Sequence, residues 1–224
     1  MARELEHPFT LAFALATVSW IYSTVRDADR TLVLAEEAVA LSTKYSFEVT
    51  LAWATSLQGW ALAEKGEEQG LGRLVKGLSA TKAAGASLNN TFTLALLAEV
   101  YLRKKRIDEG LAAITEAQHL VLTQRERCWQ AELFRLKGEL LLEQSERSAL
   151  AAEQSFSEAL KIAHDQHAGM LELRAATSMA RLLRKLNRLD AAKQVLQSAR
   201  SRFNERVANP DLIEAQTILE QLGV

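Results

Sequence analysis

Small residues recur along this chain at an interval of about 40 residues, and this internal repeat restricts the chain to stacked architectures. The recurring positions are nearly evenly spaced along the sequence: Ala38, Gly77, Ala117, Ala159 and Ala199. Three residues before them stand Ala35, Leu74, Ile114, Phe156 and Leu196, and four residues earlier again stand Thr31, Gly70, Gly110, Ala152 and Ala192. A fixed period of this length indicates an array of similar units, each of which buries the apolar face of its neighbour.

Helix-forming residues dominate the stretches between the interruptions of the pattern. The chain has two prolines, Pro8 and Pro210, and is rich in alanine, leucine, glutamate, lysine and arginine. We therefore expect about ten helices and one further terminal helix. Asn209 followed by Pro210 is a typical start of that last helix, because asparagine caps the first turn and proline suits its first position.

The first helix of each pair also carries a small residue where close packing needs one. The matching positions in the last four pairs are Gly59, Ala98, Gly138 and Ala180. A glycine such as Gly138 inside a leucine-rich helix costs roughly 0.5–1 kcal/mol relative to alanine, so we expect it to allow close helix contact. This alternation of small and large residues resembles the tetratricopeptide repeat (TPR), although the usual TPR period is shorter and the usual closing prolines are absent.

The resemblance predicts an all-α fold, a TPR-like right-handed superhelix (α-solenoid) of about five helix pairs plus a C-terminal capping helix. We expect one domain over residues 1–224, with helices of about 15 to 18 residues. The expected repeats are 8–43, 47–84, 88–124, 127–166 and 170–204, and the capping helix is 209–222.

Four longer strings are similar to a narrower group of proteins. They are LQGWALAEKG (57–66), LALLAEVYL (94–102), AELFRLKGELLL (131–142) and ELRAATSMARLLRKLNRLDAAKQVL (172–196). They resemble the C-terminal TPR region of large bacterial signalling proteins that carry adenylate or guanylate-cyclase-like and AAA or STAND-type ATPase modules. The resemblance implies a sensor or partner-binding arm, and we expect the chain to be a fragment whose catalytic modules lie upstream.

Several function classes are disfavoured by composition and motifs. The 27 basic and 28 acidic residues nearly cancel, which gives no overall attraction to nucleic acid or an anionic membrane. One cysteine, Cys128, excludes an intramolecular disulfide framework and favours a cytoplasmic location. No phosphate-binding loop is present, the pair His164 and His167 lacks further metal ligands, and Cys128 is expected to be a buried small hydrophobe. We predict no enzyme activity, no cofactor and no metal.

Two groups of residues are candidates for a concave ligand groove formed by the first helices. Trp20, Trp53 and Trp60 lie on the first helices of the first two pairs, and Trp53 and Trp60 share a helix face. The alternative interpretation is that these tryptophans pack in the core. The second group is basic: Arg135, Arg174, Arg181, Arg184, Lys185 and Arg188. Residues 171–206 hold nine basic and three acidic side chains, a net charge of +6, which could bind an acidic peptide or simply form a solvated face.

The sequence thus predicts a non-catalytic module that binds a protein or peptide and serves an attached or associated ATPase or cyclase. Two alternatives stay open at this point. One is a small-molecule-sensing helical-repeat domain of an ATPase-type regulator, and the other is a free-standing scaffold or adaptor.

Overall fold

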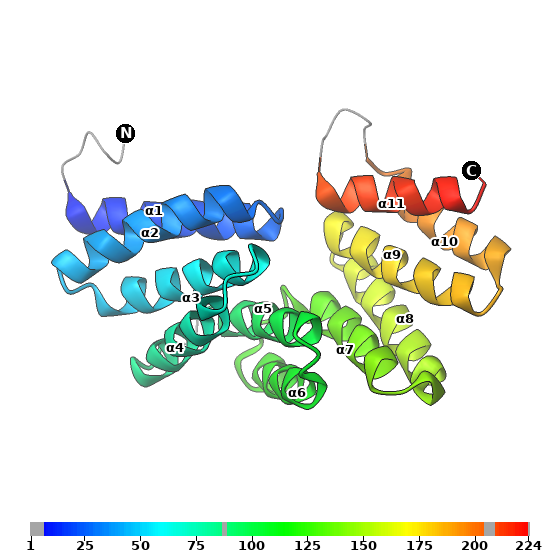
Figure 1. Ribbon diagram of the computed structural model, residues 1–224, viewed down its shortest axis with the longest axis horizontal. Coiled ribbons are helices and arrows are strands. Elements are labelled where there is room, and N and C mark those ends of the chain that lie inside the picture. The colour runs from blue at the N-terminus through cyan, green and yellow to red at the C-terminus, as the bar shows by residue number, and fades with distance from the viewer. Residues whose placement is uncertain (1–6, 87–88, 204–208, 224) are drawn as a thin grey trace. The chain divides into compact units, whose positions relative to one another are not determined.

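The computed structural model describes residues 7–86, 89–203 and 209–223, and all regular structure in these residues is helical. In chain order the first helices are α1 (Pro8–Thr24), α2 (Ala28–Lys44), α3 (Glu48–Glu64), α4 (Gln69–Ala83), α5 (Asn90–Arg103) and α6 (Ile107–Gln124). They are followed by α7 (Gln130–Gln144), the 3-10 turn η1 (Glu146–Ser148), α8 (Ala149–Asp165), α9 (Gly169–Lys185), α10 (Leu189–Arg200) and α11 (Pro210–Gln221). The predicted all-α class is confirmed (Figure 1).

Two compact units divide the chain, Met1–Val100 and Tyr101–Val224. Unit 1 contains α1 to α4 and most of α5, and unit 2 contains α6 to α11. The single domain expected from the sequence stays a prediction. Within the described residues, none of the helices combines the length and apolar character needed to cross a bilayer.

Backbone bonds, rather than prolines, end most of these helices. A residue with positive φ follows the helix, as at Arg26 (φ 62°), Ser46 (58°) and His167 (53°). The next amide then donates to the carbonyl five residues back, as Asp27 does to Tyr22 at 3.0 Å and Phe47 to Ser42 at 2.9 Å. This is the Schellman arrangement, which satisfies carbonyls left open at the helix end.

Within unit 1, α2 contacts α1 and α3, α3 contacts α4, and α1 also contacts α3. The tightest contact joins α3 and α4 through glycines. A Cβ at Gly59 would lie 2.3 Å from the Leu74 amide nitrogen, and one at Gly70 would lie 2.4 Å from the Ala63 nitrogen. These two backbones therefore approach closer than any side chain would permit.

Unit 2 repeats the same contact pattern along the chain, because each helix from α6 to α11 contacts the next and α9 also contacts α7 and α11. Gly138 of α7 packs against α8, where a Cβ would lie 2.4 Å from the Phe156 ring. The close packing predicted for Gly138 is confirmed. The small repeat positions Ala38, Gly77, Ala117, Ala159 and Ala199 are all buried.

The start of α11 is also confirmed, since the Asn209 side chain accepts a hydrogen bond from the Asp211 amide and Pro210 occupies the first turn. Leu212, Ala215 and Ile218 complete the core that α8, α9 and α10 form with it. Glu214, Gln216, Glu220 and Gln221 are exposed. As expected of a capping helix, α11 covers apolar surface with one face and presents polar residues with the other.

Candidate functional site

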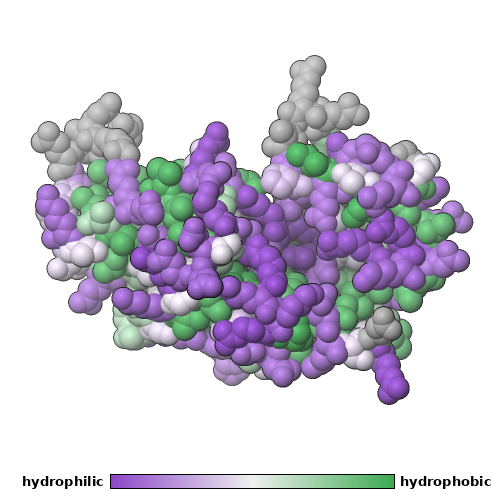
Figure 2. Space-filling view, in the orientation of Figure 1, coloured by the Kyte–Doolittle hydropathy of each residue, from purple (hydrophilic) through white to green (hydrophobic). Residues whose placement is uncertain are grey.

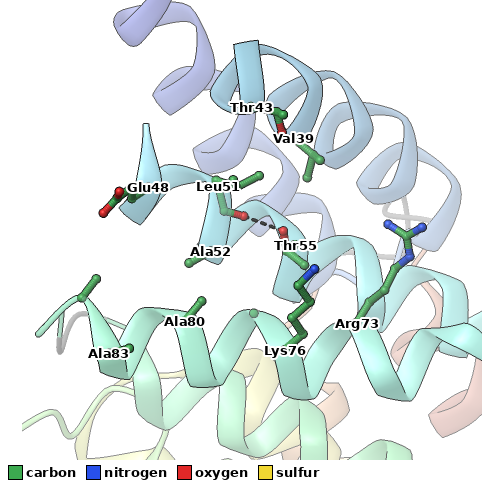
Figure 3. Close-up of a pocket in the computed structure, with 12 residues that line it drawn as sticks. Val39, Thr43, Glu48, Leu51, Ala52, Thr55, Arg73, Lys76, Ala80 and Ala83 are labelled. Atoms are coloured by element: carbon green, nitrogen blue, oxygen red, sulfur yellow. Dashed lines mark hydrogen bonds between the residues drawn. The ribbon is translucent and has the colours of Figure 1, made fainter. Parts of the chain in front are cut away.

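A pocket of about 890 Å³ lies between α2, α3 and α4 of unit 1 (Figure 3). It is lined by Val39 and Thr43 from α2, by Glu48, Leu51, Ala52 and Thr55 from α3, and by Arg73, Lys76, Gly77, Ala80, Ala83 and Ala84 from α4 and its end. The walls are mainly apolar, and most polar groups stand on one side. Mostly apolar walls with a few converging polar groups are typical of ligand sites.

The pocket owes its space to small residues of α4. Gly77 lines it, and a Cβ there would lie 2.3 Å from the Ser56 hydroxyl, so α3 and α4 still touch at this point. Beyond Gly77, α4 presents only Ala80, Ala83 and Ala84 to the pocket. Small side chains at consecutive turns leave room between the helices that larger ones would fill.

Two cations from successive turns of α4 mark one side of this pocket. The Arg73 guanidinium donates to the Gln58 side-chain oxygen at 2.8 Å, which orients it. Lys76 follows three residues later, is exposed, and rises from α4 on the same side as Arg73 (Figure 3). Thr55 turns its hydroxyl to the Leu51 carbonyl at 2.7 Å, and Glu48 stands at the start of α3. An occupant would thus meet positive charge on one side and a carboxylate near the start of α3.

The predicted aromatic candidates lie on α1 and α3, but they differ in exposure. Trp60 is fully buried, which agrees with core packing, the alternative interpretation, and not with ligand contact. Trp53 is half-buried, and its ring lies 6.0 Å from that of Phe13. Trp20 is half-buried and meets Phe92 edge to face at 6.1 Å. For Trp20 and Trp53 the groove assignment stays a prediction.

Four of the six predicted basic residues form ion pairs with carboxylates inside unit 2. Arg135 is buried and donates to both carboxylate oxygens of Glu132 on α7, at 2.9 and 2.7 Å. Arg181 on α9 bridges Glu139 of α7 at 2.6 Å and Glu214 of α11 at 2.7 Å. Arg174, also buried, donates to Asp211 at 2.8 Å. We call these ion pairs of α7, α9 and α11 the unit 2 network.

The remaining basic candidates lie at the end of α9 and in the connection to α10. Arg188 pairs with Glu153 of α8 at 2.7 Å, Arg184 donates to Gln221 of α11, and Lys185 is exposed. The structure therefore does not leave the six cations as one open positive stripe, because at least four of them are neutralised by carboxylates. Figure 2 shows a largely hydrophilic surface over α9 and α11, where basic and acidic side chains pair with each other. Binding of a ligand by these residues stays a prediction.

Glu139 lies at the centre of the unit 2 network and has a lowered pKa. Burial raises the pKa of this carboxyl, but the charges of Arg181 and Arg135 and the hydrogen bonds from Ser178 and Arg181 outweigh it and shift the pKa below 4.5. A carboxyl with a depressed folded-state pKa contributes stability above its unfolded pKa, about 4.3, and loses that contribution as pH falls through its folded pKa.

We therefore expect Glu139→Gln to lower the urea midpoint of unfolding at pH 7, by an amount that shrinks as the pH falls below about 4. The Gln side chain keeps the shape but cannot attract the two guanidinium groups. Urea melts of both proteins between pH 7 and pH 2.5, followed by circular dichroism, measure the difference. A difference that stays constant over this range would contradict the assigned role of the Glu139 charge.

The structure also places Cys128 and His164, two residues considered in the sequence analysis. Cys128 is exposed, so its predicted burial is wrong: it stands in the short connection before α7, whereas Ala131, one turn later, is the residue that packs inside. His164 is exposed and contacts the Glu172 carboxylate at 3.5 Å and Arg202 at 3.1 Å. Among the described residues, no three or more His, Cys, Asp or Glu side chains cluster as metal ligands.

Sequence reasoning missed the pocket because it looked for function on the first helices alone. Half of the lining residues come from α4 and its end, and α4 is a second helix. The spacing of Arg73, Lys76, Ala80 and Ala83 along α4 places a cationic pair and two small residues on one helix face, and this signal could have been read. The depth of the pocket depends on how far α3 and α4 separate, which the pattern does not encode.

Comparison with known proteins supports the fold. A crystal structure of a Podospora anserina protein, described as a putative kinesin light chain with nearly identical TPR-like repeats, is similar to this chain with a TM-score of 0.60. The similarity covers 88% of this chain and 95% of the other, at 13% sequence identity. No protein-family model matches the chain, and no curated protein matches it. The helices thus form a TPR-like repeat fold.

Proposed function

We propose that this chain is a protein-interaction module and that the pocket between α2, α3 and α4 binds a short peptide segment carrying aliphatic side chains and a carboxylate. The observation that carries the proposal is the pairing of an apolar wall with Arg73 and Lys76 on one side. An aliphatic side chain would bury against Leu51, Ala52 and Ala80, and the carboxylate would accept charge-assisted hydrogen bonds from the two cations.

The TPR-like fold supports a peptide as the ligand, because arrays of this kind present extended surfaces to other proteins. A small molecule is the second candidate. It is favoured by the volume of the pocket, since about 890 Å³ lies within the range of roughly 300–1,000 Å³ found for small-ligand sites. Both candidates need the same cations, so the experiment has to separate them by ligand.

The test selects dodecamer peptides from a random displayed library on the wild-type protein and measures the isolated peptides by fluorescence anisotropy. We expect Lys76→Glu to weaken the selected peptides by at least tenfold, because a charge-assisted hydrogen bond contributes about 1.5–3 kcal/mol and each 1.4 kcal/mol is tenfold in affinity. Replacing the acidic residue of a selected peptide by its amide should remove most of the difference between the two proteins.

Lys82→Glu is the matched control, because Lys82 is an exposed lysine of the same helix that does not line the pocket. It makes the same charge change and should leave affinity within about twofold, a range expected of screened surface charges. If the selected peptides bind Lys76→Glu and Lys82→Glu with the same affinity as they bind the wild type, the pocket assignment is contradicted. If the library yields no peptide and a metabolite gives a saturable thermal shift that Lys76→Glu removes, the small-molecule candidate is favoured.

We also propose that the module is the sensor or partner-binding arm of a bacterial signalling ATPase or nucleotide cyclase. The support is the resemblance of residues 57–66, 94–102, 131–142 and 172–196 to the C-terminal region of such proteins. The intact mass of the protein purified from its source cells tests this. A mass far above 24.8 kDa would support an attached module, and a mass near this value with no ATPase or cyclase co-purifying would favour an adaptor.

A further inference from the structure

Helices α3 and α4, which form two walls of the pocket, run antiparallel. A Cβ at Gly59 would lie 2.3 Å from the Leu74 nitrogen, and a Cβ at Gly77 would lie 2.7 Å from the Ala52 carbonyl oxygen. A later residue of α4 thus meets an earlier residue of α3, so the end of α4 lies beside the start of α3. The pocket runs along both helices toward this end.

The two ends of the pocket carry opposite charges. Figure 3 shows Glu48, at the start of α3, at the same end as Ala83, and Lys76 toward the other end. Glu48 and Lys76 are exposed, and within the described residues neither of them forms an ion pair, so both charges are open to a ligand. Lys44 of α2 does not line the pocket, and its ammonium group lies over the Tyr45 ring, 5.2 Å from the centroid. The Glu48 end therefore offers an occupant a negative charge.

The wall that α4 contributes has a regular spacing. Lys76, Ala80 and Ala84 all line the pocket at intervals of four residues, which places them on one helix face, about 6 Å apart along α4. An extended peptide advances about 6.4–6.8 Å in two residues, and its side chains at i, i+2 and i+4 lie on one side. Three alternate side chains of a peptide that lies along α4 would thus meet Lys76, Ala80 and the Glu48 end in turn.

From this spacing we infer that the pocket recognises five consecutive residues of an extended peptide, with an acidic side chain at one end, an aliphatic one in the middle and a basic one at the other end. The acidic side chain meets Lys76 and Arg73, the aliphatic one packs on Leu51 and Ala80, and the basic one pairs with Glu48. The inference rests on the proposed function, to which it adds the basic side chain and the spacing of four residues.

A helical ligand would need a different spacing between its charges. A helix takes four residues to advance about 6 Å, so its acidic and basic residues would stand eight residues apart. Nine residues of helix form a cylinder of about 10 Å by 13.5 Å, roughly 1,060 Å³, which exceeds the pocket volume of about 890 Å³. The pocket therefore suits an extended segment better than a helix.

The test uses the peptides selected on the full wild-type chain from the random dodecamer library. We expect these peptides to be enriched in an acidic and a basic residue at a spacing of four. In anisotropy titrations, Glu48→Lys should weaken the strongest of these peptides by about fivefold or more, the size expected when an exposed ion pair becomes a like-charge pair. Replacing the basic residue of the peptide by glutamate should weaken its binding to the wild type by a similar factor and restore its binding to Glu48→Lys.

Glu67→Lys is the matched control, because Glu67 is exposed in the connection before α4 and does not line the pocket. It makes the same charge change and should leave affinity within about twofold. Moving the basic residue of the peptide by one position turns its side chain to the other side, which should cost as much as Glu48→Lys does. Glu48→Gln is the second variant should Glu48→Lys fail to fold.

The outcomes separate this inference from the function on which it rests. If the peptides depend on Lys76 but bind Glu48→Lys as they bind the wild type, the inference is overturned and the proposed function stands. Enrichment at a spacing of eight residues would overturn it in favour of a helical ligand. If no peptide is selected, or if the selected peptides bind Lys76→Glu as they bind the wild type, the peptide assignment and the inference fail together.

Discussion

Gly70→Ala is expected to lower the free energy of unfolding by about 2–3 kcal/mol, whereas Gly72→Ala, two residues along α4, is expected to raise it by about 0.5–1 kcal/mol. The Cβ of an alanine at position 70 would lie 2.4 Å from the Ala63 nitrogen and 2.8 Å from the Gly59 carbonyl oxygen. Both are backbone atoms, so only separation of α3 and α4 relieves the clash. At Gly72 no atom lies within 4 Å of the added carbon.

The pair is its own control, because both substitutions give the same gain in helix propensity and the same change in the unfolded chain. Urea melts of the two variants and the wild type, followed by circular dichroism, measure the difference. Effects of the same sign would show that the glycine contact does not set the distance between α3 and α4. The pocket depends on that distance, so Gly70→Ala should also weaken any peptide that the pocket selects.

Arg174→Met is expected to cost about 3–5 kcal/mol, since it leaves Asp211 buried without its main counter-charge. The two side chains are 8% and 6% exposed and lie 2.8 Å apart. Replacing both, as Arg174→Met with Asp211→Leu, should recover much of the loss, because a buried ion pair gives little net stability over a well-packed apolar pair. Hydrogen exchange should show the loss first in α11.

Arg188→Met is the comparison for this prediction. It removes an ion pair of similar length with Glu153, but the two side chains are 50% and 25% exposed. Solvent screens such a pair, and its removal should cost no more than about 1 kcal/mol. If Arg174→Met were as mild as Arg188→Met, the burial of the Arg174 pair could not be the source of its effect.

The repeat made the helical part of this fold predictable, since the period, the small positions and the Asn209 cap all follow from local residue chemistry. Gly138 shows this best: a glycine in a leucine-rich helix predicted a close neighbour, and Phe156 of α8 is that neighbour. The unit 2 network was predicted less well. The spacing placed Arg174 and Arg181 on one helix but could not show that Asp211 and Glu214, which belong to a helix much later in the chain, would meet them.

Burial was the hardest property to predict for single side chains. Trp60 and Trp53 share a helix face in the sequence pattern, yet Trp60 is enclosed and Trp53 is only half-buried. Cys128 was expected to be buried on residue type alone, but it lies in the connection between α6 and α7 and is exposed. These outcomes depend on contacts between distant parts of the sequence.

The way these helices end has a consequence for how such a chain changes over evolutionary time. The Schellman bonds after α1, α2 and α8 join backbone atoms only, and residues as different as Arg26, Ser46 and His167 occupy the left-handed position. Glycine would lower the conformational cost there by about 1 kcal/mol, but none is required. The connections can therefore change in sequence while the helices keep their places, because no particular side chain is needed to end a helix.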